Sequence, residues 1–276
     1  PRSIDPRRFF QSSSNEWGSP QAEFEIPYGN LAQNCGYAMI AQRYGAQYGY
    51  IEEAMAKLVV DQRQNGALNP LAAFYGKPTT VEEVLTSKMI ADPLRMLEIV
   101  MPVAGGGAVV VASREVAERC RHRPAWIAGF GEHLTIKTPT YAKDMCATPV
   151  GPASKQAFTM AGVGIQDIDA AQIYDCYTIT VLMTLEDAGF CAKGEGQRFI
   201  MDSDLTHDGS FPLNTHGGQL GMGQAGAAGG MTQVVEAARQ IMGRAEARQV
   251  STCDNVYVSG TGGIMSEQAA LILQGN

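Results

Sequence analysis

Residues 214–230 read NTHGGQLGMGQAGAAGG, and a helical pattern, MTQVVEAARQIMG, follows directly at 231–243. Seven of these seventeen residues are glycine. Fixing a glycine in regular structure costs roughly 0.5–1 kcal/mol more than fixing an alanine, so this stretch needs the bare backbone for some purpose. It is either a tight structural turn or a loop whose N–H groups approach a ligand at the positive end of the following helix. The loop residues alone leave both interpretations open.

Short apolar runs alternate with helical patterns along most of the chain. The runs typical of strands covered on both faces are GGGAVVVAS (105–113), PAWIAGFGE (124–132), AAQIYDCYT (170–178) and NVYVSGTGG (255–263). Helical patterns lie between them, from about residues 154, 181 and 231. This alternation predicts an α/β sheet with helices on its faces. We expect strands at about 107–112, 171–176, 255–260 and 269–273 in one sheet, with a helix at about 228–242 packed on it.

The first third of the chain has a different pattern. Residues 1–27 show no consistent period and are interpreted as an extended arm. Apolar stripes over 31–43 and 51–62 predict two antiparallel helices, and Thr80 with Glu83 predicts a capping box at the start of a short helix. We therefore divide the chain into an arm and mainly helical part at 1–88 and an α/β part at 89–276.

Composition argues against several classes of function. The chain has 276 residues, 18% of them charged, and a net charge of −7, which disfavours a nucleic-acid partner held by phosphate contacts. No apolar run reaches the roughly 18–20 residues that span a bilayer, so we expect a soluble protein without a membrane span. The six cysteines form no CxxC pair and no regular spacing, which predicts no metal site and no disulfide framework. Unpaired thiols and thirteen methionines are typical of a reducing cytoplasm, where we expect the protein.

Three blocks of the sequence resemble the thiolase superfamily, in that family's order. The glycine loop NTHGGQLGMGQAGAAGG resembles its C-terminal glycine loop. The block DIDAAQIYDCYTITVLMTLEDAGFCAKGEG, residues 167–196, is similar to the block that contains His-Asp-Cys-Phe in sterol-carrier-protein-type thiolases. The third block, FYGKPTTVEEVLTSKMIADPLRMLEIVMPVAGGGAVVVAS, resembles the passage from that family's loop domain back into the sheet.

The resemblance implies both a fold and an activity. The fold is a thiolase-like layered α/β/α fold, with a helical loop domain preceding the C-terminal half. The activity is an acyl-CoA acyltransferase or an aldolase/lyase of lipid metabolism, with coenzyme A as part of the substrate and no bound cofactor. The resemblance further implies a homodimer and, in this branch, a separately encoded small subunit with a zinc ribbon and an OB fold. It favours the interpretation of the glycine loop as a functional loop.

Departures from the family pattern suggest the chemistry. Gly223-Gln224-Ala225 stands in place of the family's Gly-His-Pro, and an amide can donate a hydrogen bond but cannot carry a proton. Tyr174 takes the place of the histidine in His-Asp-Cys-Phe. Ser266 and Gln268 occupy the region where thiolases have an acid/base cysteine.

These matches give the expected site residues. We expect Tyr174, His216 and Gln224 to be catalytic and to converge in one pocket. Gln224 and the glycine loop would stabilise an enolate oxygen, and Tyr174 or His216 would move a proton. The residues expected to contact the substrate are Asp175, Cys176, Gly217, Gly218, Gly223, Gly262 and Ser266.

Three functions remain open. Loss of the family histidine and of the C-terminal cysteine slightly favours retro-aldol cleavage without a covalent intermediate. The alternative is a cysteine-dependent acetyl-CoA acyltransferase, whose nucleophile would lie upstream of Pro1. The third is a lipid-carrying or scaffolding subunit that kept the fold without the chemistry.

Overall fold

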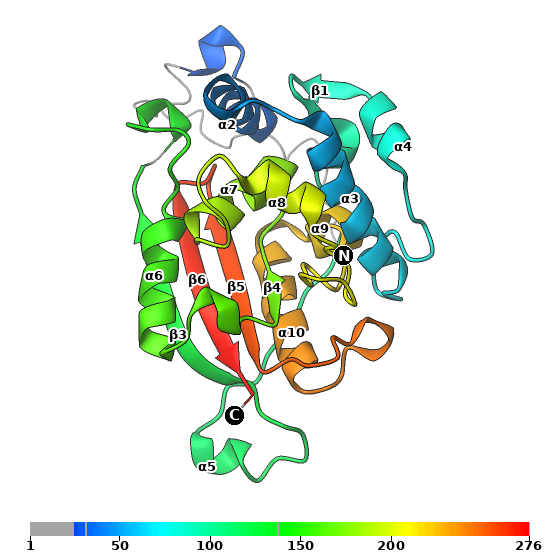
Figure 1. Ribbon diagram of the computed structural model, residues 1–276, viewed down its shortest axis with the longest axis vertical. Helices are drawn as coiled ribbons and strands as arrows, with labels where there is room; N and C mark the ends of the chain where they lie inside the picture. The colour runs from blue at the N-terminus through cyan, green and yellow to red at the C-terminus, as the bar shows by residue number, and fades with distance from the viewer. Residues whose placement is uncertain (1–24, 31, 137, 276) are drawn as a thin grey trace.

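A four-stranded sheet lies at the centre of the molecule in a computed structural model that describes residues 25–30, 32–136 and 138–275 (Figure 1). Its strands, in spatial order, are β3 (Trp126–Leu134), β6 (Glu267–Gln274), β5 (Asn255–Gly262) and β4 (Ala170–Gln172). Strand β6 is antiparallel to both neighbours, whereas β4 runs parallel to β5, with Ala170 opposite Val256. The expectation that the segments near 171, 255 and 269 share one sheet is therefore confirmed.

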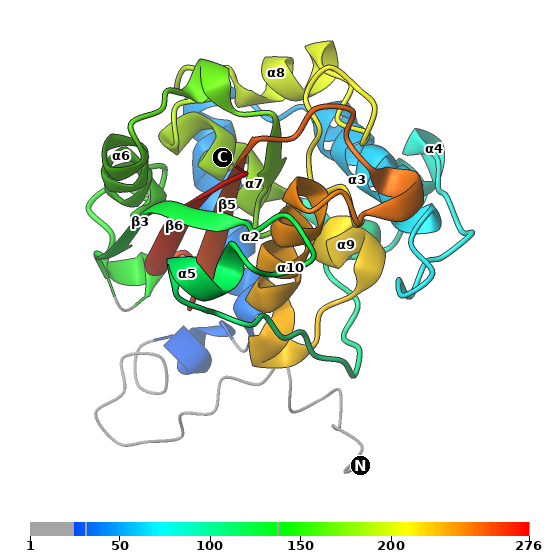
Figure 2. The same cartoon turned by 90° about the horizontal axis from the view of Figure 1, so that it is seen from below.

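Helices cover both faces of this sheet (Figures 1 and 2). On one face, α10 (Gly229–Ile241) places Ala237 and Ile241 in a hydrophobic cluster with Val256, Val258 and Leu273. On the other face, α6 (Val150–Ala161) packs against β3 and β6. Successive side chains along a strand thus pack against helices on opposite faces of the sheet, as the two-residue period of a strand requires. The expected helix at 228–242, packed on the sheet, is confirmed.

The expected strand at 107–112 is wrong. Residues 103–113 form an extended segment that pairs with no described strand, and Val110 is 96% exposed. A β-branched run forms a strand only where a neighbouring strand offers a ladder of hydrogen-bond partners, whereas here Val103 N reaches a single carbonyl, that of Gln224, and no described strand lies alongside. Strand β3 was expected to be covered on both faces, but it lies at the edge of the sheet, and its Phe130 is 55% exposed.

The helical layer matches its sequence pattern. Helices α2 (Gln33–Tyr48) and α3 (Glu52–Ala67) confirm the two expected helices. Helix α4 (Val81–Thr86) begins at the expected capping box, in which Glu83 N donates to Thr80 Oγ1 at 3.2 Å and Thr80 N donates to Glu83 Oε2 at 3.0 Å.

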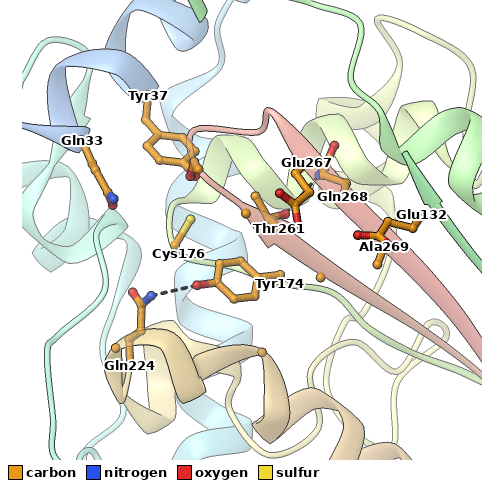
Figure 3. A pocket seen from close by; sticks show the side chains of 15 residues that line it. Gln33, Tyr37, Glu132, Tyr174, Cys176, Gln224, Thr261, Glu267, Gln268 and Ala269 are labelled. Atoms are coloured by element: carbon orange, nitrogen blue, oxygen red, sulfur yellow. Dashed lines mark hydrogen bonds between the residues drawn. The ribbon is translucent and has the colours of Figure 1, made fainter. Parts of the chain in front are cut away.

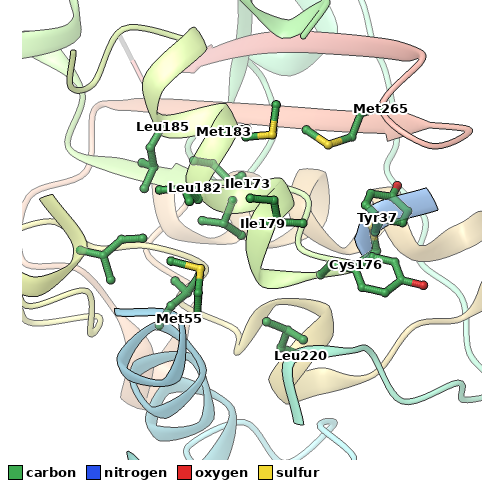
Figure 4. Close-up of a cluster of buried hydrophobic side chains, with 14 of the residues drawn as sticks. Tyr37, Met55, Ile173, Cys176, Ile179, Leu182, Met183, Leu185, Leu220 and Met265 are labelled. Atoms are coloured by element: carbon green, nitrogen blue, oxygen red, sulfur yellow. The ribbon is translucent and has the colours of Figure 1, made fainter. Parts of the chain in front are cut away.

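Residues of the helical layer and of the sheet share one hydrophobic core (Figure 4). Helix α7 (Thr178–Asp187) is buried over almost its whole length and contributes Leu182 and Leu185, and α3 contributes Met55. The division near residue 88 stays a prediction, and it coincides with a hairpin of β1 (Met89–Ala91) and β2 (Leu94–Arg95). The predicted arm at 1–27 lies largely outside the described residues. The remaining short helices are α5 (Arg114–Ala117), α8 (Gly196–Asp202) and α9 (Gly218–Met222).

Candidate active site

A cavity of about 540 Å³ opens where α2, the end of β4, the β5–β6 hairpin and the glycine loop meet (Figure 3). Its lining residues are Gln33, Tyr37, Glu132, Tyr174, Cys176, Gln224, Gly226, Gly230, Gly260, Thr261, Gly262, Gly263, Glu267, Gln268 and Ala269. Segments more than 200 residues apart in sequence therefore form one site. Of the expected site residues, Tyr174, Gln224, Cys176 and Gly262 line this cavity.

Tyr174 and Gln224 form a hydrogen-bonded pair on the cavity wall. Gln224 Nε2 donates to Tyr174 Oη at 2.8 Å (Figure 3). Burial raises the pKa of Tyr174 above that of a free phenol, so the hydroxyl is protonated at neutral pH. Because the oxygen accepts from the amide, its own hydrogen is left to donate to another acceptor. The pair therefore presents a neutral, oriented proton donor.

Backbone contacts fix both members of this pair. Tyr174 lies two residues beyond β4, and its N–H donates to Ser259 Oγ at 3.3 Å. Gln224 is held by the segment before the extended run: its N–H donates to Met101 O, and its carbonyl accepts from Val103 N, both at 2.9 Å. Each side chain thus projects from backbone anchored to a different part of the fold.

Cys176 lines the cavity as an unreactive thiol. It is 5% exposed, and burial raises its pKa to about 12. The attacking species in cysteine chemistry is the thiolate, which this environment disfavours. Beside it, the Tyr37 hydroxyl donates to Gly263 O at 3.2 Å, and the Tyr37 ring stacks on Tyr177 at a centroid distance of 4.0 Å. Cys176 therefore packs against the site without the activation that a nucleophile requires.

His216 does not reach the cavity. It is 2% exposed, is not among the lining residues, and burial lowers its pKa to about 4. An imidazole in such surroundings is neutral at physiological pH and has no route to a substrate in this cavity. The expected convergence of three side chains thus reduces to two, because the His216 ring is buried in the interior and does not line the cavity.

Asp175 also lies behind the cavity wall. Its carboxylate is 0% exposed and accepts from Gln219 N at 2.7 Å, Leu220 N at 3.0 Å and Gln233 Nε2 at 3.2 Å. Burial raises its pKa to about 7. With all its visible contacts inside the protein, it does not offer the substrate contact that the sequence suggested.

The first half of the glycine loop packs closely against other segments, and its second half lines the cavity. In the first half, a Cβ on Gly217 would lie 2.6 Å from Gly66 Cα of α3, and one on Gly223 would lie 2.7 Å from the Val103 side chain. A Cβ on Gly218 would overlap the Asp175 carboxylate. These three glycines permit close packing and do not line the cavity, whereas Gly226 and Gly230 of the second half do. Both interpretations of the loop therefore apply, each to different glycines.

Ser266 is likewise buried outside the cavity, and its Oγ donates to Gly262 O at 3.4 Å. Several lining residues carried no sequence signal, since Glu132 and Glu267 lie in ordinary strand texture and Tyr37 in an ordinary helix. Only the meeting of distant segments reveals them. The described residues hold no cluster of three or more histidine, cysteine or acidic side chains suited to a metal ion, and the expectation of no metal site stays a prediction.

The layered sheet, the strand-end tyrosine and the glycine loop define a thiolase-like α/β protein. The chain belongs to the thiolase superfamily, because residues 131–275 match the family described as thiolase C-terminal domain-like. This confirms the resemblance that the glycine loop and the 167–196 block suggested.

Named relatives lie in the branch of sterol-carrier-protein-type thiolases and related lyases. A steroid side-chain-cleaving aldolase of Thermomonospora curvata is 35% identical, over 86% of this chain and 61% of the relative. A 17-hydroxy-3-oxo-4-pregnene-20-carboxyl-CoA lyase of Mycobacterium tuberculosis is 34% identical, over 87% of this chain and 62% of the relative. A solved structure titled Ltp2-ChsH2(DUF35) aldolase is 31% identical, with a TM-score of 0.83, over 96% of this chain and 69% of that one. The chain thus spans about three fifths of the length of the two curated relatives.

Proposed function

We propose that this chain forms part of an enzyme that cleaves a carbon–carbon bond of a β-hydroxyacyl-CoA thioester by a retro-aldol reaction. The observation that carries the proposal is the Tyr174–Gln224 pair, a neutral phenol oriented by an amide in a cavity of substrate size. Relatives named as an aldolase and as a CoA lyase support the reaction class. A covalent route through Cys176 is disfavoured by the raised pKa of its thiol.

The reaction balances without a co-reactant. The β-hydroxyl loses its proton, the bond between the α- and β-carbons breaks, and its electron pair passes into the thioester as an enolate. A carbonyl compound leaves, and the α-carbon then takes up one proton to give the shorter acyl-CoA. The proton that leaves the hydroxyl equals the proton that the α-carbon gains.

Cavity residues have distinct roles in this scheme. The Tyr174 hydroxyl donates to the thioester oxygen, where negative charge develops, and Gln224 keeps the phenol in position. Carboxylates of Glu132 and Glu267 line the same cavity and provide acceptors for the proton of the β-hydroxyl. The cavity-facing Gly226 and Gly230 leave room for the thioester to approach the backbone.

The assembly belongs to the same proposal. A DUF35-type partner is supported by the solved Ltp2-ChsH2(DUF35) aldolase, which this chain resembles. We also expect the chain to form a homodimer. We propose an acyl-CoA substrate and no resident cofactor, because the retro-aldol scheme calls for neither oxidant nor reductant. Among the described helices, none combines the length and apolarity needed to cross a membrane.

A direct assay tests the proposal. The full-length protein, alone and with its DUF35-type partner, is incubated with β-hydroxyacyl-CoA thioesters, and mass spectrometry follows the carbonyl product and the shortened acyl-CoA. A parallel reaction with β-ketoacyl-CoA and free coenzyme A tests thiolysis. Retro-aldol products without thiolysis support the proposal. Thiolysis with an acylated cysteine would establish the acyltransferase alternative, and a folded protein inactive in both assays would favour a carrier or scaffold.

A further inference from the structure

We propose that Asp175 is a positioning residue, whose buried carboxylate holds the glycine loop where Gln224 can reach Tyr174. This inference rests on the proposed function, in which that pair acts on the thioester. Asp175 does not line the cavity that Tyr174 and Gln224 share, so it would act on turnover through the groups that it holds.

Three donors converge on the carboxylate from two helices. Oδ1 accepts from Gln219 N at 2.7 Å and from Gln233 Nε2 of α10 at 3.2 Å, and Oδ2 accepts from Leu220 N at 3.0 Å. Gln219 and Leu220 belong to α9, whose backbone N–H groups at its first turn lack partners within the helix. Gly218 is the residue that lets the carboxylate come this close, because any side chain there would overlap Oδ2. The loop is thus shaped around this one acceptor.

The position of Asp175 connects both members of the catalytic pair. It is the chain neighbour of Tyr174, and it binds α9, which ends at Met222, two residues before Gln224. The carboxylate therefore fixes the spacing between the segment that carries the phenol and the segment that carries the amide. A shift of α9 away from Asp175 would lengthen the 2.8 Å contact between Gln224 Nε2 and Tyr174 Oη.

Other contacts keep the loop folded when the carboxylate is weakened. Gly217 and Gly221 pack against α3, and the backbone of Gln224 is bonded to Met101 and Val103. These contacts hold the loop near its place independently of Asp175. A substitution at Asp175 is therefore expected to leave a folded protein with a displaced amide.

Asp175→Asn is the test, with Asp61→Asn as the control for another buried carboxylate, one that is paired with Lys57. The asparagine keeps one acceptor but turns an NH₂ group toward an N–H that needs an acceptor. Asp61 is also buried and accepts from a backbone N–H, that of Leu205 at 3.4 Å, but it does not line the cavity. We expect Asp175→Asn to lower kcat by up to about 13-fold, no more than the loss of the neutral Gln224–Tyr174 hydrogen bond itself, with KM within about threefold of wild type. Asp61→Asn should leave both constants near wild type.

Hydrogen exchange of the peptide that covers residues 214–224 gives a readout without turnover. The amides of Gln219 and Leu220 should exchange faster in Asp175→Asn and at the wild-type rate in Asp61→Asn. Gln233→Leu, which removes one of the three donors to the carboxylate, provides a milder second variant and should lower kcat by less than Asp175→Asn does. If wild type cleaves no β-hydroxyacyl-CoA, the proposed function fails, yet the exchange data still test the anchoring. Unchanged kcat and exchange in Asp175→Asn, or faster exchange spread equally over the whole sheet, would overturn the positioning role.

Discussion

Gly217→Ala should destabilise the protein because two separate penalties act at this residue. Its backbone has φ +104° and ψ −2°, in the left-handed region that alanine avoids, at a cost of about 1–2 kcal/mol. The added Cβ would lie 2.6 Å from Gly66 Cα, where helix backbone cannot rotate away, and overpacking of this kind costs about 1–3 kcal/mol. Together these penalties predict a loss of about 2–5 kcal/mol.

Gly29→Ala is the control that separates the two penalties. Gly29 has nearly the same backbone, φ 93° and ψ 3°, but a Cβ there would meet no atom within 4 Å. Gly243→Ala, at φ +65° and also in open space, adds a second control in a different part of the chain. Both should show the backbone penalty alone, about 1–2 kcal/mol.

Thermal and chemical denaturation measure the difference. At roughly 2 °C per kcal/mol for a domain of this size, Gly217→Ala should lower Tm by about 4–10 °C and each control by about 2–4 °C. If Gly217→Ala loses no more stability than Gly29→Ala, the close approach of the loop to α3 is refuted as the reason for this glycine.

Three further predictions follow from the site. Tyr174→Phe should lower kcat by about 10²–10³-fold, the contribution of one donor to the oxygen on which negative charge develops, whereas Gln224→Ala removes one neutral hydrogen bond and should cost about 2- to 13-fold. Steady-state kinetics measure both variants, with Tyr75→Phe, an exposed tyrosine, as control, and the reverse order of effects would contradict the roles assigned. Alkylation of the exposed thiol Cys120 and other accessible thiols should leave turnover intact, and a labelled acyl group trapped on any cysteine of the full-length protein would contradict the non-covalent route. The stability of the protein should change with pH in opposite senses through two buried groups, each measured by denaturation of the variant against wild type between pH 4 and 8. The pKa of His216 falls from about 6.5 unfolded to about 4 folded, so stability is lost as pH falls through this range, and His216→Gln should remove that loss. Burial raises the pKa of Asp175, which lies beside the neutral Tyr174 and Cys176, from about 4 in the unfolded chain to about 7, so stability is lost as pH rises from about 4 to 7, and Asp175→Asn should reduce that loss. Profiles of stability against pH identical to that of wild type would show that these groups do not titrate as described.

Local interactions made much of the fold readable from the sequence. The capping box of Thr80 and Glu83 involves residues three apart, and the apolar stripes of α2, α3 and α10 repeat within each helix, so short stretches carry the whole signal. The glycine loop, the block at 167–196 and the block that begins at Phe74 were distinctive enough to indicate the family. Tyr174 and Gln224 could be named as site residues because their family positions already lie on a strand end and a loop.

Contacts between distant segments decided the rest. The run at 107–112 has the composition of a strand, but pairing needs a neighbouring strand, and the described chain places none beside it. His216 and Asp175 look like active-site residues in sequence, yet their burial depends on how α9 packs, which no pattern within the loop encodes. In the same way, only the distances between backbone segments decide which glycines pack against α3 and which line the cavity. The sequence by itself determined the family and most of the helices and strands, because those signals are local. Only the tertiary structure decided whether 107–112 pairs and which residues line the cavity, because pairing, burial and close approach depend on residues far away in the chain.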